Sequence, residues 1–559
     1  MKRLIIALII FLISNQAFPA DHYICVDSAG SGTGADWTNA WTSFSAATWT
    51  RGDTYYVCGS DTTYSAYNFN KVESGATPIT IKKAMEATNG GVAGWIASYG
   101  TKQAIIKGGI LFRSSYWVFD GVTGSDNDVS SYGFRINEAT CDGSTQSSGF
   151  VGLTTSTNGL TVTNLDISHV AIVLCGPILN KEMTGLGGGS SETIVGSDIN
   201  VSNCYFSGCN VNITWRNCSD CIINNNYFND NWSSSANHGG SLVAYNCDNL
   251  IVKNNLFKGV SSYVLGTKRG CGSTAITPST GTGSGISTSL ANGLLTDYRQ
   301  SWSTDDLVGK NYQLRVIHGS TSRYYEIIAN TSSTITVLPA IMVDNGAVSG
   351  DSYMIVGCWG SSSNIQFYNN IIIGSYPEKN NDGVINSDSS YVDTALNMKT
   401  YNNTWYKVGF YAQGTTWAGS LSNPTISKPL VSNNLFYMCC NHGIKSNEGI
   451  WNNNAELTCT GTAIIDGING QVDAGAADPF LNKSAEDFRL VSGSLAIDSG
   501  LTLGALYQID RDGSVRPQGS AWDIGAYEFR SNTSMMGVYN VKGMSGYYNA
   551  NGMVGIAPN

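Results

Sequence analysis

The centre of the chain holds the densest group of residues whose side chains could take up or release protons. His238 stands out, because the chain has only five histidines and this one lies in Asn-His-Gly-Gly, directly before a strand-like run. An imidazole can act as a general base near neutral pH, and a lysine or arginine can stabilise the negative charge that forms. The other ionisable residues of this region include Arg216, Asp230, Asp248, Lys253, Lys258, Lys268 and Arg269. The candidate catalytic residues among them are Arg216, His238, Lys258 and Lys268.

A purely structural interpretation of these residues stays open. His238 would fit a turn, and Lys253, Lys258, Lys268 and Arg269 would fit solvated positions on the outside of the protein. The arrangement of the four candidates in space separates the two interpretations. Convergence in one groove favours an enzyme, whereas scattering favours a binding protein.

The fourteen cysteines are typical of an oxidising compartment. Cys25 and Cys58 lie in two strand-like runs, and a disulfide between them would join these strands if they are neighbours. Cys271 and Cys358 bracket a segment of different composition and could close its neck with a second disulfide. Cys218 and Cys221 have the spacing of a metal-binding pair, but the chain has no second pair of this kind, so we favour a disulfide or free thiols.

The amino-acid composition and net charge limit the fold classes and the classes of partner that fit this chain. Only 13% of the residues are charged, while strand-forming residues alternate with turn formers, which favours many short strands over helices. The net charge of −10 disfavours nucleic acid or an anionic membrane as partner. An acidic carbohydrate would also be repelled, unless a local basic patch or a bridging cation such as calcium intervenes. We expect no required cofactor, and the oligomeric state stays open.

The N-terminus resembles a secretory signal peptide. Lys2 and Arg3 precede the apolar run Leu4 to Ile13, and cleavage after Ala20 would follow the small residues that end it. An uncleaved anchor is the alternative. No later segment approaches the length of a transmembrane helix. We therefore expect a secreted or cell-surface protein outside the bacterial cytoplasm.

A short motif, an apolar residue followed by one variable residue, Asn and often a second Asn, recurs at intervals of about 20–40 residues, the period of a solenoid. Asn tolerates the left-handed backbone of a sharp corner, and stacked Asn side chains can form a hydrogen-bonded ladder from coil to coil. The repeat predicts an all-β fold, a right-handed parallel β-helix. The Asn residues expected to stack are Asn203, Asn225, Asn254, Asn369, Asn402 and Asn433.

One long gap between motifs contains alternating apolar and polar runs such as Tyr312 to Ile317, which indicates a small antiparallel β module inserted into one loop. We therefore divide the chain into a signal peptide (1–20), a first part of the solenoid (21–270), the inserted module (271–358), a second part of the solenoid (359–490), a C-terminal capping region (491–530) and a tail (531–559). We expect the tail, rich in Gly, Met, Tyr and Asn, to be loosely held and to serve attachment or transport.

Two stretches resemble known families. Residues 76–84, 94–95 and 116–121 resemble the first coils of pectate-lyase-superfamily β-helix proteins. Residues 478–480, 487–490, 496–500, 512–513, 516–517 and 522–528, which end in Trp-Asp-Ile-Gly-Ala-Tyr-Glu, resemble the surface domain called choice-of-anchor Q. The resemblance implies the fold and an extracellular setting, because this superfamily contains lyases, hydrolases, adhesins and phage spikes. No lyase motif matches residue by residue.

Two functions follow as expectations. The first is a carbohydrate-active enzyme, more in keeping with a polysaccharide lyase than with a glycoside hydrolase, because the clustered Asp residues and the Gly-His-Gly of β-helix hydrolases are absent. The second is a non-catalytic surface or adhesion protein whose solenoid binds glycans through exposed Tyr and Trp. In both, the partner is a polysaccharide or a cell-surface glycan.

Overall fold

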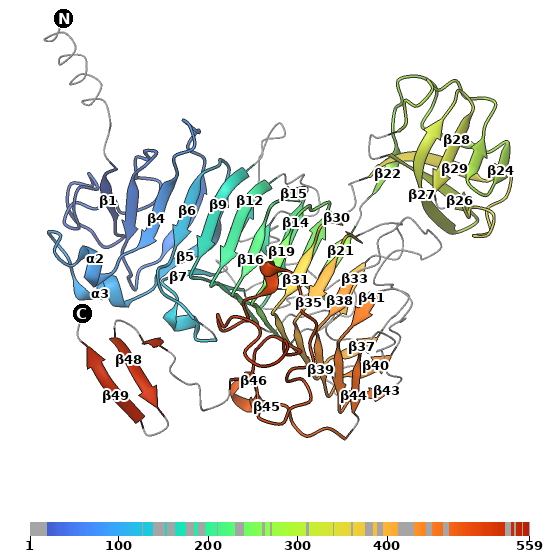
Figure 1. The fold of residues 1–559 in the computed structure, drawn as a ribbon. Coiled ribbons are helices and arrows are strands. Elements are labelled where there is room, and N and C mark those ends of the chain that lie inside the picture. The colour runs from blue at the N-terminus through green and yellow to red at the C-terminus, as the bar shows by residue number, and fades with distance from the viewer. Residues whose placement is uncertain are drawn as a thin grey trace, which may run out of the picture.

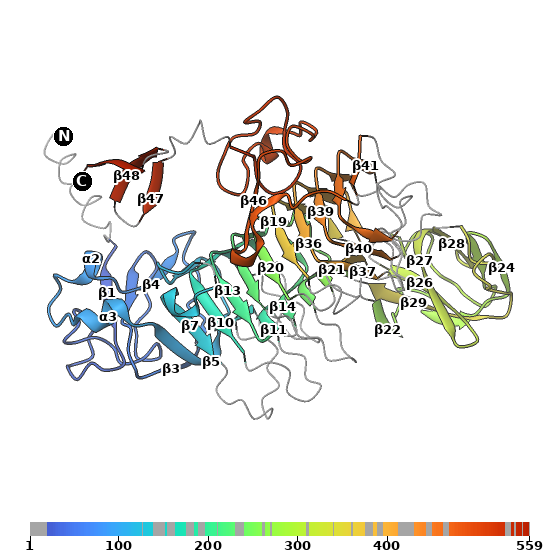
Figure 2. The same ribbon diagram turned by 90° about the horizontal axis from the view of Figure 1, so that it is seen from below.

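The predicted parallel β-helix is confirmed in the computed structural model of the protein (Figures 1 and 2). Helices are few and short, among them α2 (Glu86–Asn89) and α3 (Ala97–Thr101) beside the first coils. The structure describes residues 19–125, 127–137, 151–153, 162–174, 184–187, 196–209, 211–229, 240–259, 263–268, 271–308, 312–338, 340–358, 362–374, 384–387, 395–411, 430–442, 450–461, 469–473, 475–530, 538–541, 544–549 and 552–557.

The coils of the solenoid contribute strands to three rows of parallel strands, which we call the first, second and third faces. The first face runs the length of the solenoid in register from coil to coil. Its strands are β1 (Asp21–Ile24), β2 (Thr54–Val57), β4 (Ile79–Lys83), β6 (Trp117–Asp120), β9 (Val162–Ser168), β12 (Gly196–Ser202), β16 (Ile222–Asn224), β19 (Ile251–Lys253), β31 (Gln366–Tyr368), β35 (Lys399–Tyr401), β38 (Leu430–Ser432) and β41 (Ile450–Asn452).

The second and third faces share the long strand β5 (Ala104–Phe112), which pairs with one strand of the second face and with two strands of the third. The second face continues through β7 (Phe134–Asn137), β10 (Val170–Val173), β13 (Tyr205–Ser207), β17 (Tyr227–Asn229), β20 (Leu256–Lys258), β32 (Ile371–Ile373), β36 (Thr404–Tyr406), β39 (Leu435–Tyr437), β42 (Ala455–Leu457) and β44 (Gln471–Asp473). The third face contains β3 (Tyr64–Phe69), β8 (Val151–Leu153), β11 (Thr184–Gly187), β14 (Val211–Arg216), β18 (Gly240–Tyr245), β21 (Tyr263–Lys268) and β33 (Val384–Ser387). In the last coils, β37 (Gly409–Tyr411), β40 (Cys440–His442) and β43 (Thr460–Gly461) form a separate parallel sheet.

Identical side chains stack inside the solenoid because each coil repeats the register of the coil before it. The rings of Phe206, Phe228 and Phe257 lie in one such column, with centroids 4.9 and 4.7 Å apart. Stacked rings at this spacing add to the free energy that burial of their apolar surface already provides. The core is thus a set of columns that run parallel to the solenoid axis.

From Asn225 to Asn454, the corner between the first and second faces is built from two consecutive Asn residues with different roles, whereas in the coil of Asn203 the second residue is Cys204. The first has a left-handed backbone: φ is 52° at Asn203, 54° at Asn225 and 57° at Asn254, and the same holds for Asn369, Asn402, Asn433 and Asn453. The six predicted Asn residues therefore do stack at one corner, in the conformation that Asn tolerates.

The buried amide ladder is formed by the second Asn, one position after the predicted residues. In each pair of adjacent coils the Nδ2 of one Asn donates to the Oδ1 of the next at 2.9–3.1 Å, and the backbone N–H beside it donates to the same oxygen. Each Nδ2 also donates to a carbonyl of the preceding coil. We correct the ladder accordingly to Asn226, Asn255, Asn370, Asn403, Asn434 and Asn454.

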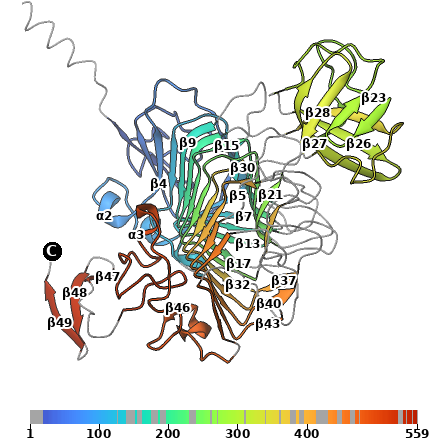
Figure 3. The ribbon, with the colours of Figure 1, turned by 45° about the vertical axis from the view of Figure 1, so that its right-hand side comes forward.

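The predicted inserted module is an antiparallel sheet with its own core, which projects from the solenoid (Figures 1 and 3). Cys271 and Cys358 are directly opposed in its ladder, at the neck of the module. Their side chains lie outside the described residues, so their disulfide stays a prediction. The strands are β22 (Cys271–Ala275), β23 (Ser284–Ile286), β24 (Ser289–Ala291), β25 (Leu294–Thr296), β26 (Tyr312–His318), β27 (Thr321–Asn330), β28 (Thr334–Leu338) and β29 (Ser352–Cys358).

The C-terminal region, residues 475–530, lies along the flank of the solenoid (Figures 2 and 3). The expected cap over its last coil is therefore wrong in placement. Side chains that point outward from the second face, such as Leu256, Ile371 and Leu435, are buried against Phe488 and Ile524 of this region. The region includes the hairpin of β45 (Phe480–Asn482) and β46 (Asp487–Leu490).

The tail contains a three-stranded antiparallel sheet rather than only irregular chain. Its strands are β47 (Val538–Val541), β48 (Met544–Asn549) and β49 (Gly552–Ala557). Its role in attachment or transport stays a prediction. The signal peptide also stays a prediction, because residues 1–18 lie outside the described part of the chain.

We predict that Asn403→Ala lowers the free energy of unfolding by about 1–3 kcal/mol, because it leaves the buried backbone N–H and Nδ2 of Asn370 without their acceptor. Chemical denaturation monitored by circular dichroism measures the change. The matched control is Asn225→Gly at the exposed first position, where glycine accepts the left-handed backbone and only one side-chain bond, to Asn203, is lost. Equal losses for the two variants would contradict the role of the ladder.

Candidate functional site

Two of the four predicted catalytic residues share one column of the third face. Strand β14 ends at Arg216, β18 at Tyr245 and β21 at Lys268, and these three residues are direct partners in the parallel ladder. Adjacent strands lie about 4.8 Å apart, so Arg216 and Lys268 are separated by two such steps. The side chains of both cations lie outside the described residues.

The side chains that are described show which side of the third face this column occupies. Leu242 and Ala244 of β18 belong to the core of the solenoid. Val243 instead forms a separate small cluster with Val211, against which Tyr245 packs, because successive side chains of a strand point to opposite sides. Tyr245 is only partly buried. The column that contains Tyr245 therefore runs along the outer side of the third face.

Lys258 does not join this column. It ends β20 on the second face, where its Nζ lies 2.7 Å from Oε1 of Glu486 in the C-terminal region. The Tyr227 hydroxyl donates to the same carboxylate at 2.9–3.0 Å. Lys258 therefore lies apart from the column, and its ion pair with Glu486 joins the solenoid to the C-terminal region.

His238 lies outside the described residues, in the segment 230–239 that leads directly into β18. Asp248 and Lys253 of the same central group belong to other parts of the coil. The Asp248 carboxylate accepts hydrogen bonds from Ser363 and from Asn364 of the next coil, and Lys253 ends β19 on the first face. Those central ionisable residues that the structure describes thus divide between faces, and among them only Arg216 and Lys268 share a register position.

Aromatic side chains on the described solenoid are mostly buried, either in its core or, like Tyr205, Tyr227 and Tyr437, against the C-terminal region. Among the large apolar side chains that the structure describes as exposed, Tyr298 is the one aromatic residue, and it is 75% exposed on the inserted module. Within the described part of the chain, the exposed aromatic ring therefore lies on the module, whereas solenoid rings such as Tyr245 are partly or fully buried. This distinction could not be made from the number of Tyr and Trp residues.

The backbone around Tyr298 is held by a buried carboxylate. Asp297 is 1% exposed, and it accepts hydrogen bonds from Nε of Arg299 at 2.7 Å and from the Tyr353 hydroxyl at 2.8 Å. The hydrogen bonds from Arg299, Tyr353 and Gln300 lower the pKa of Asp297 against the opposing effect of burial, which keeps it ionised. The neighbouring exposed ring is thus presented by a fixed turn.

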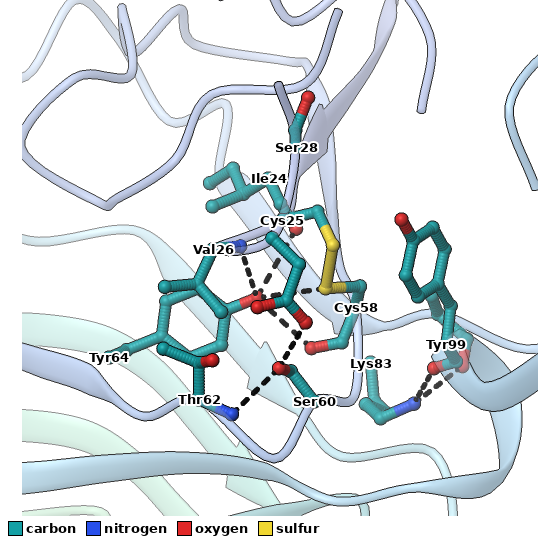
Figure 4. The surroundings of a disulfide bond; sticks show 12 residues. Ile24, Cys25, Val26, Ser28, Cys58, Ser60, Thr62, Tyr64, Lys83 and Tyr99 are labelled. Carbon is teal, nitrogen blue, oxygen red and sulfur yellow. Dashed lines mark hydrogen bonds between the residues drawn. A yellow bond between two sulfur atoms is a disulfide. The ribbon is translucent and has the colours of Figure 1, made fainter. Parts of the chain in front are cut away.

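Lys83 is a buried cation that sequence reasoning did not single out. Its side chain is 1% exposed, and its Nζ donates to the backbone carbonyls of Ala84 at 2.9 Å and Tyr99 at 2.5 Å, beside the Cys25–Cys58 disulfide (Figure 4). Burial lowers the pKa of Lys83 to about 7. A lysine with a pKa in this range could act as a base, but here its nitrogen is directed at backbone carbonyls inside the first coils, so its role is structural.

Among the described residues, no group of three or more His, Cys, Asp or Glu side chains is arranged to hold a metal ion. Calcium as a bridging cation stays an expectation. Cys218 bonds to Cys247 of the next coil and Cys221 is a free thiol, so the two members of the CxxC pair have different partners. No helix in the described part of the chain is long and apolar enough to cross a membrane.

Comparison with known proteins adds likenesses to solved structures. No family model matches the sequence, and no curated protein matches it. Among solved structures, the chain is similar to the pectate lyase Pel9A, with a TM-score of 0.43 and 13% identity over 93% of this chain and 98% of that chain. It is also similar to a mutant of the PL6 family alginate lyase AlyGC, with a TM-score of 0.35 and 11% identity over 77% of this chain and 50% of that chain. Neither likeness bears on which residues act here, and the resemblance to choice-of-anchor Q stays a prediction.

We predict that the stability of the protein rises as the pH increases from about 7 towards 10, and that Lys83→Met removes this part of the dependence. The pKa of Lys83 is lowered to about 7 on folding from 10.5, so the unfolded chain binds more protons in this interval and folding is favoured as they are lost. The measurement is the difference in free energy of unfolding between the two proteins at several pH values. A difference that does not change with pH would show that Lys83 titrates normally.

Proposed function

We propose that the protein is exported and acts on a carboxylated polysaccharide that lies along the outer side of the third face. The observation that carries this proposal is the register of β14, β18 and β21, which brings Arg216, Tyr245 and Lys268 into one column. Two cations on either side of an aromatic residue suit a chain of acidic sugars, because carboxylates pair with Arg and Lys while sugar rings pack on aromatic rings.

The column also meets the requirement that the net charge imposes. A protein with a net charge of −10 repels an acidic polymer unless cations are concentrated at the place of contact. Arg216 and Lys268 supply two positive charges that strand pairing holds near each other. The proposal needs no bridging metal ion, although a bound calcium ion would act in the same sense.

The reaction that fits these groups is β-elimination. A base removes the proton next to the sugar carboxylate, Arg or Lys stabilises the negative charge that develops, and the carbon–oxygen bond to the next sugar then breaks. The products are an unsaturated sugar and a new chain end. His238 is the candidate base, because its segment leads directly into the strand that carries Tyr245.

Export is supported by residues apart from the site. The leader-like N-terminus and the disulfides Cys25–Cys58 and Cys218–Cys247 suit an oxidising, extracytoplasmic compartment. Polysaccharides of this kind are met outside the cell, so the compartment and the proposed substrate agree.

We predict that the purified protein releases ultraviolet-absorbing unsaturated products from at least one of polygalacturonate and alginate, and that Lys268→Met lowers kcat/KM at least tenfold. Loss of one charge-stabilising group costs about this much or more. The matched control is Lys258→Met, which removes a lysine that pairs with Glu486 on another face and should retain the activity. Equal losses in both variants would exclude the third face as the site.

A second function, glycan binding without catalysis, is favoured by Tyr298. Its ring is the exposed aromatic side chain on a module that has its own core and projects from the solenoid. An exposed ring on a fixed turn can pack against the apolar face of a sugar, with neighbouring polar groups for hydrogen bonding. This binding could serve an adhesion protein, or it could hold a polymer near a catalytic face.

If the module binds glycans, Tyr298→Ala should weaken retention of the protein by immobilised polysaccharide at least several-fold in affinity electrophoresis, whereas Tyr298→Phe should keep most of it because the ring remains. Val72→Ala, at another exposed apolar position, is the control for a general loss of surface. Unchanged retention of Tyr298→Ala on every polysaccharide that retains the native protein would rule out this platform.

A further inference from the structure

Seven of the described cysteines occupy one kind of position in the repeating coils. Each directly follows a residue with a left-handed backbone at a corner of the coil, as Cys218 follows Asn217 and Cys247 follows Asn246. At this position the side chain turns inward at the start of the next strand. The same holds for Cys204, Cys209, Cys221, Cys439 and Cys459, which follow Asn203, Gly208, Asp220, Met438 and Thr458.

The two disulfides that the structure describes in the solenoid each join cysteines that lie at the same register position on adjacent coils. Cys218 and Cys247 are such partners, because the bridge between Ser219 and Asp248 immediately follows them, and their Cα atoms are 4.6 Å apart. Cys25 and Cys58 directly follow the paired residues of β1 and β2, with Cα atoms 5.0 Å apart. Both separations lie within the range that a disulfide spans.

Cys439 and Cys459 meet the same condition at the other end of the solenoid. Their strands are in register on both sides of them, with Tyr437 paired to Leu457 and Cys440 paired to Thr460. The two thiols are close enough for a hydrogen bond to form between them, and burial and this contact both raise the pKa of Cys439. Cys439 is fully buried, whereas Cys459 is partly exposed.

We propose that Cys439 and Cys459, which the structure shows as thiols, form a disulfide in the exported protein by exchange with an oxidised dithiol carrier. The thiolate of the more exposed Cys459 attacks the carrier disulfide, forms a mixed disulfide and releases one carrier thiol. The Cys439 thiolate then attacks the Cys459 sulfur and displaces the second carrier thiol. The protein loses two electrons and two protons, and the carrier is reduced to its dithiol.

The position of the proposed bond gives it a structural purpose. A coil inside a solenoid is held by two neighbours, but a terminal coil has one and opens more readily. Cys25–Cys58 joins the first strands of the first face, and Cys439–Cys459 would join the last coils, whose strands β41 and β44 end their sheets. Both ends of the solenoid would then carry a covalent link between neighbouring coils.

The test is a count of free thiols in the denatured full-length protein, exported to an oxidising compartment and purified without reductant. Cys459→Ser should show one thiol more than the native protein, because Cys439 loses its partner. Cys221→Ser is the matched control and should show one thiol fewer, because Cys221 lies opposite Ile199 and Leu250 and has no cysteine in register. One thiol fewer in Cys459→Ser would overturn the proposal.

A peptide map of the native protein under non-reducing conditions provides a measurement that needs no variant. Trypsin cuts at Lys445, between the two cysteines, so a disulfide leaves two peptides joined and reduction separates them. Fragmentation of the joined peptides should place the bond at Cys439 and Cys459. A bond through Cys440, or alkylation of both residues before reduction, would overturn the proposal.

Discussion

The buried ladder of Asn side chains is the interaction on which the register of the solenoid depends. A primary amide has two donors and an oxygen with two acceptor sites, and in Asn255, Asn370, Asn403 and Asn434 the hydrogen bonds to the adjacent coils satisfy all four. A shift of one coil by a single residue would leave several buried polar groups without partners and would turn core side chains outward. The ladder thus permits one register between adjacent coils, and this register also fixes how the strands of the other faces pair. The column of Arg216, Tyr245 and Lys268 on the third face is one consequence of this alignment.

The residue before each ladder Asn serves a second purpose at the same corner. Asn369, Asn433 and Asn453 have left-handed backbones, and their side chains donate to carbonyls of Ile509, Leu501 and Ser499. The C-terminal region therefore binds the corner that the repeat creates. Within the C-terminal region, Arg516 and Glu528 form a buried ion pair, 2.8 Å apart. Each of these two charges therefore has a partner of opposite charge inside the region.

The solenoid was predictable from the sequence because its strongest constraint, the left-handed corner, selects a recognisable residue type. The predicted positions of the ladder were wrong by one residue, because we expected the same Asn to form both the corner and the ladder. A strand residue that follows a left-handed residue points inward, so the second Asn was the better candidate. The sequence also contained a pattern from which the position of the C-terminal region along the flank could have been predicted. Pairs such as Leu256-Phe257 and Leu435-Phe436 place apolar residues on both sides of a strand, which indicates that both sides are buried.

The candidate site was predictable only in part, because a spacing along the chain does not say on which face a residue lies. Arg216, Lys258 and Lys268 look equivalent in the sequence, yet the turn residues between strands direct Lys258 to the second face, where Glu486 neutralises it from a distant part of the chain. A contact between residues so far apart leaves no local pattern. The exposure of Tyr298 leaves no local pattern either, because other rings are buried by the stacking of coils or, like Tyr205 and Tyr227, by the C-terminal region.

The most direct test of the account is a crystal structure of the protein with a short galacturonate or mannuronate oligomer. The account predicts an oligomer on the outer side of the third face, with one carboxylate within hydrogen-bonding distance of Arg216 or Lys268 and a sugar ring beside Tyr245. An oligomer bound only at Tyr298 of the inserted module, or on the first face, would contradict the claim that the register of the coils builds the site.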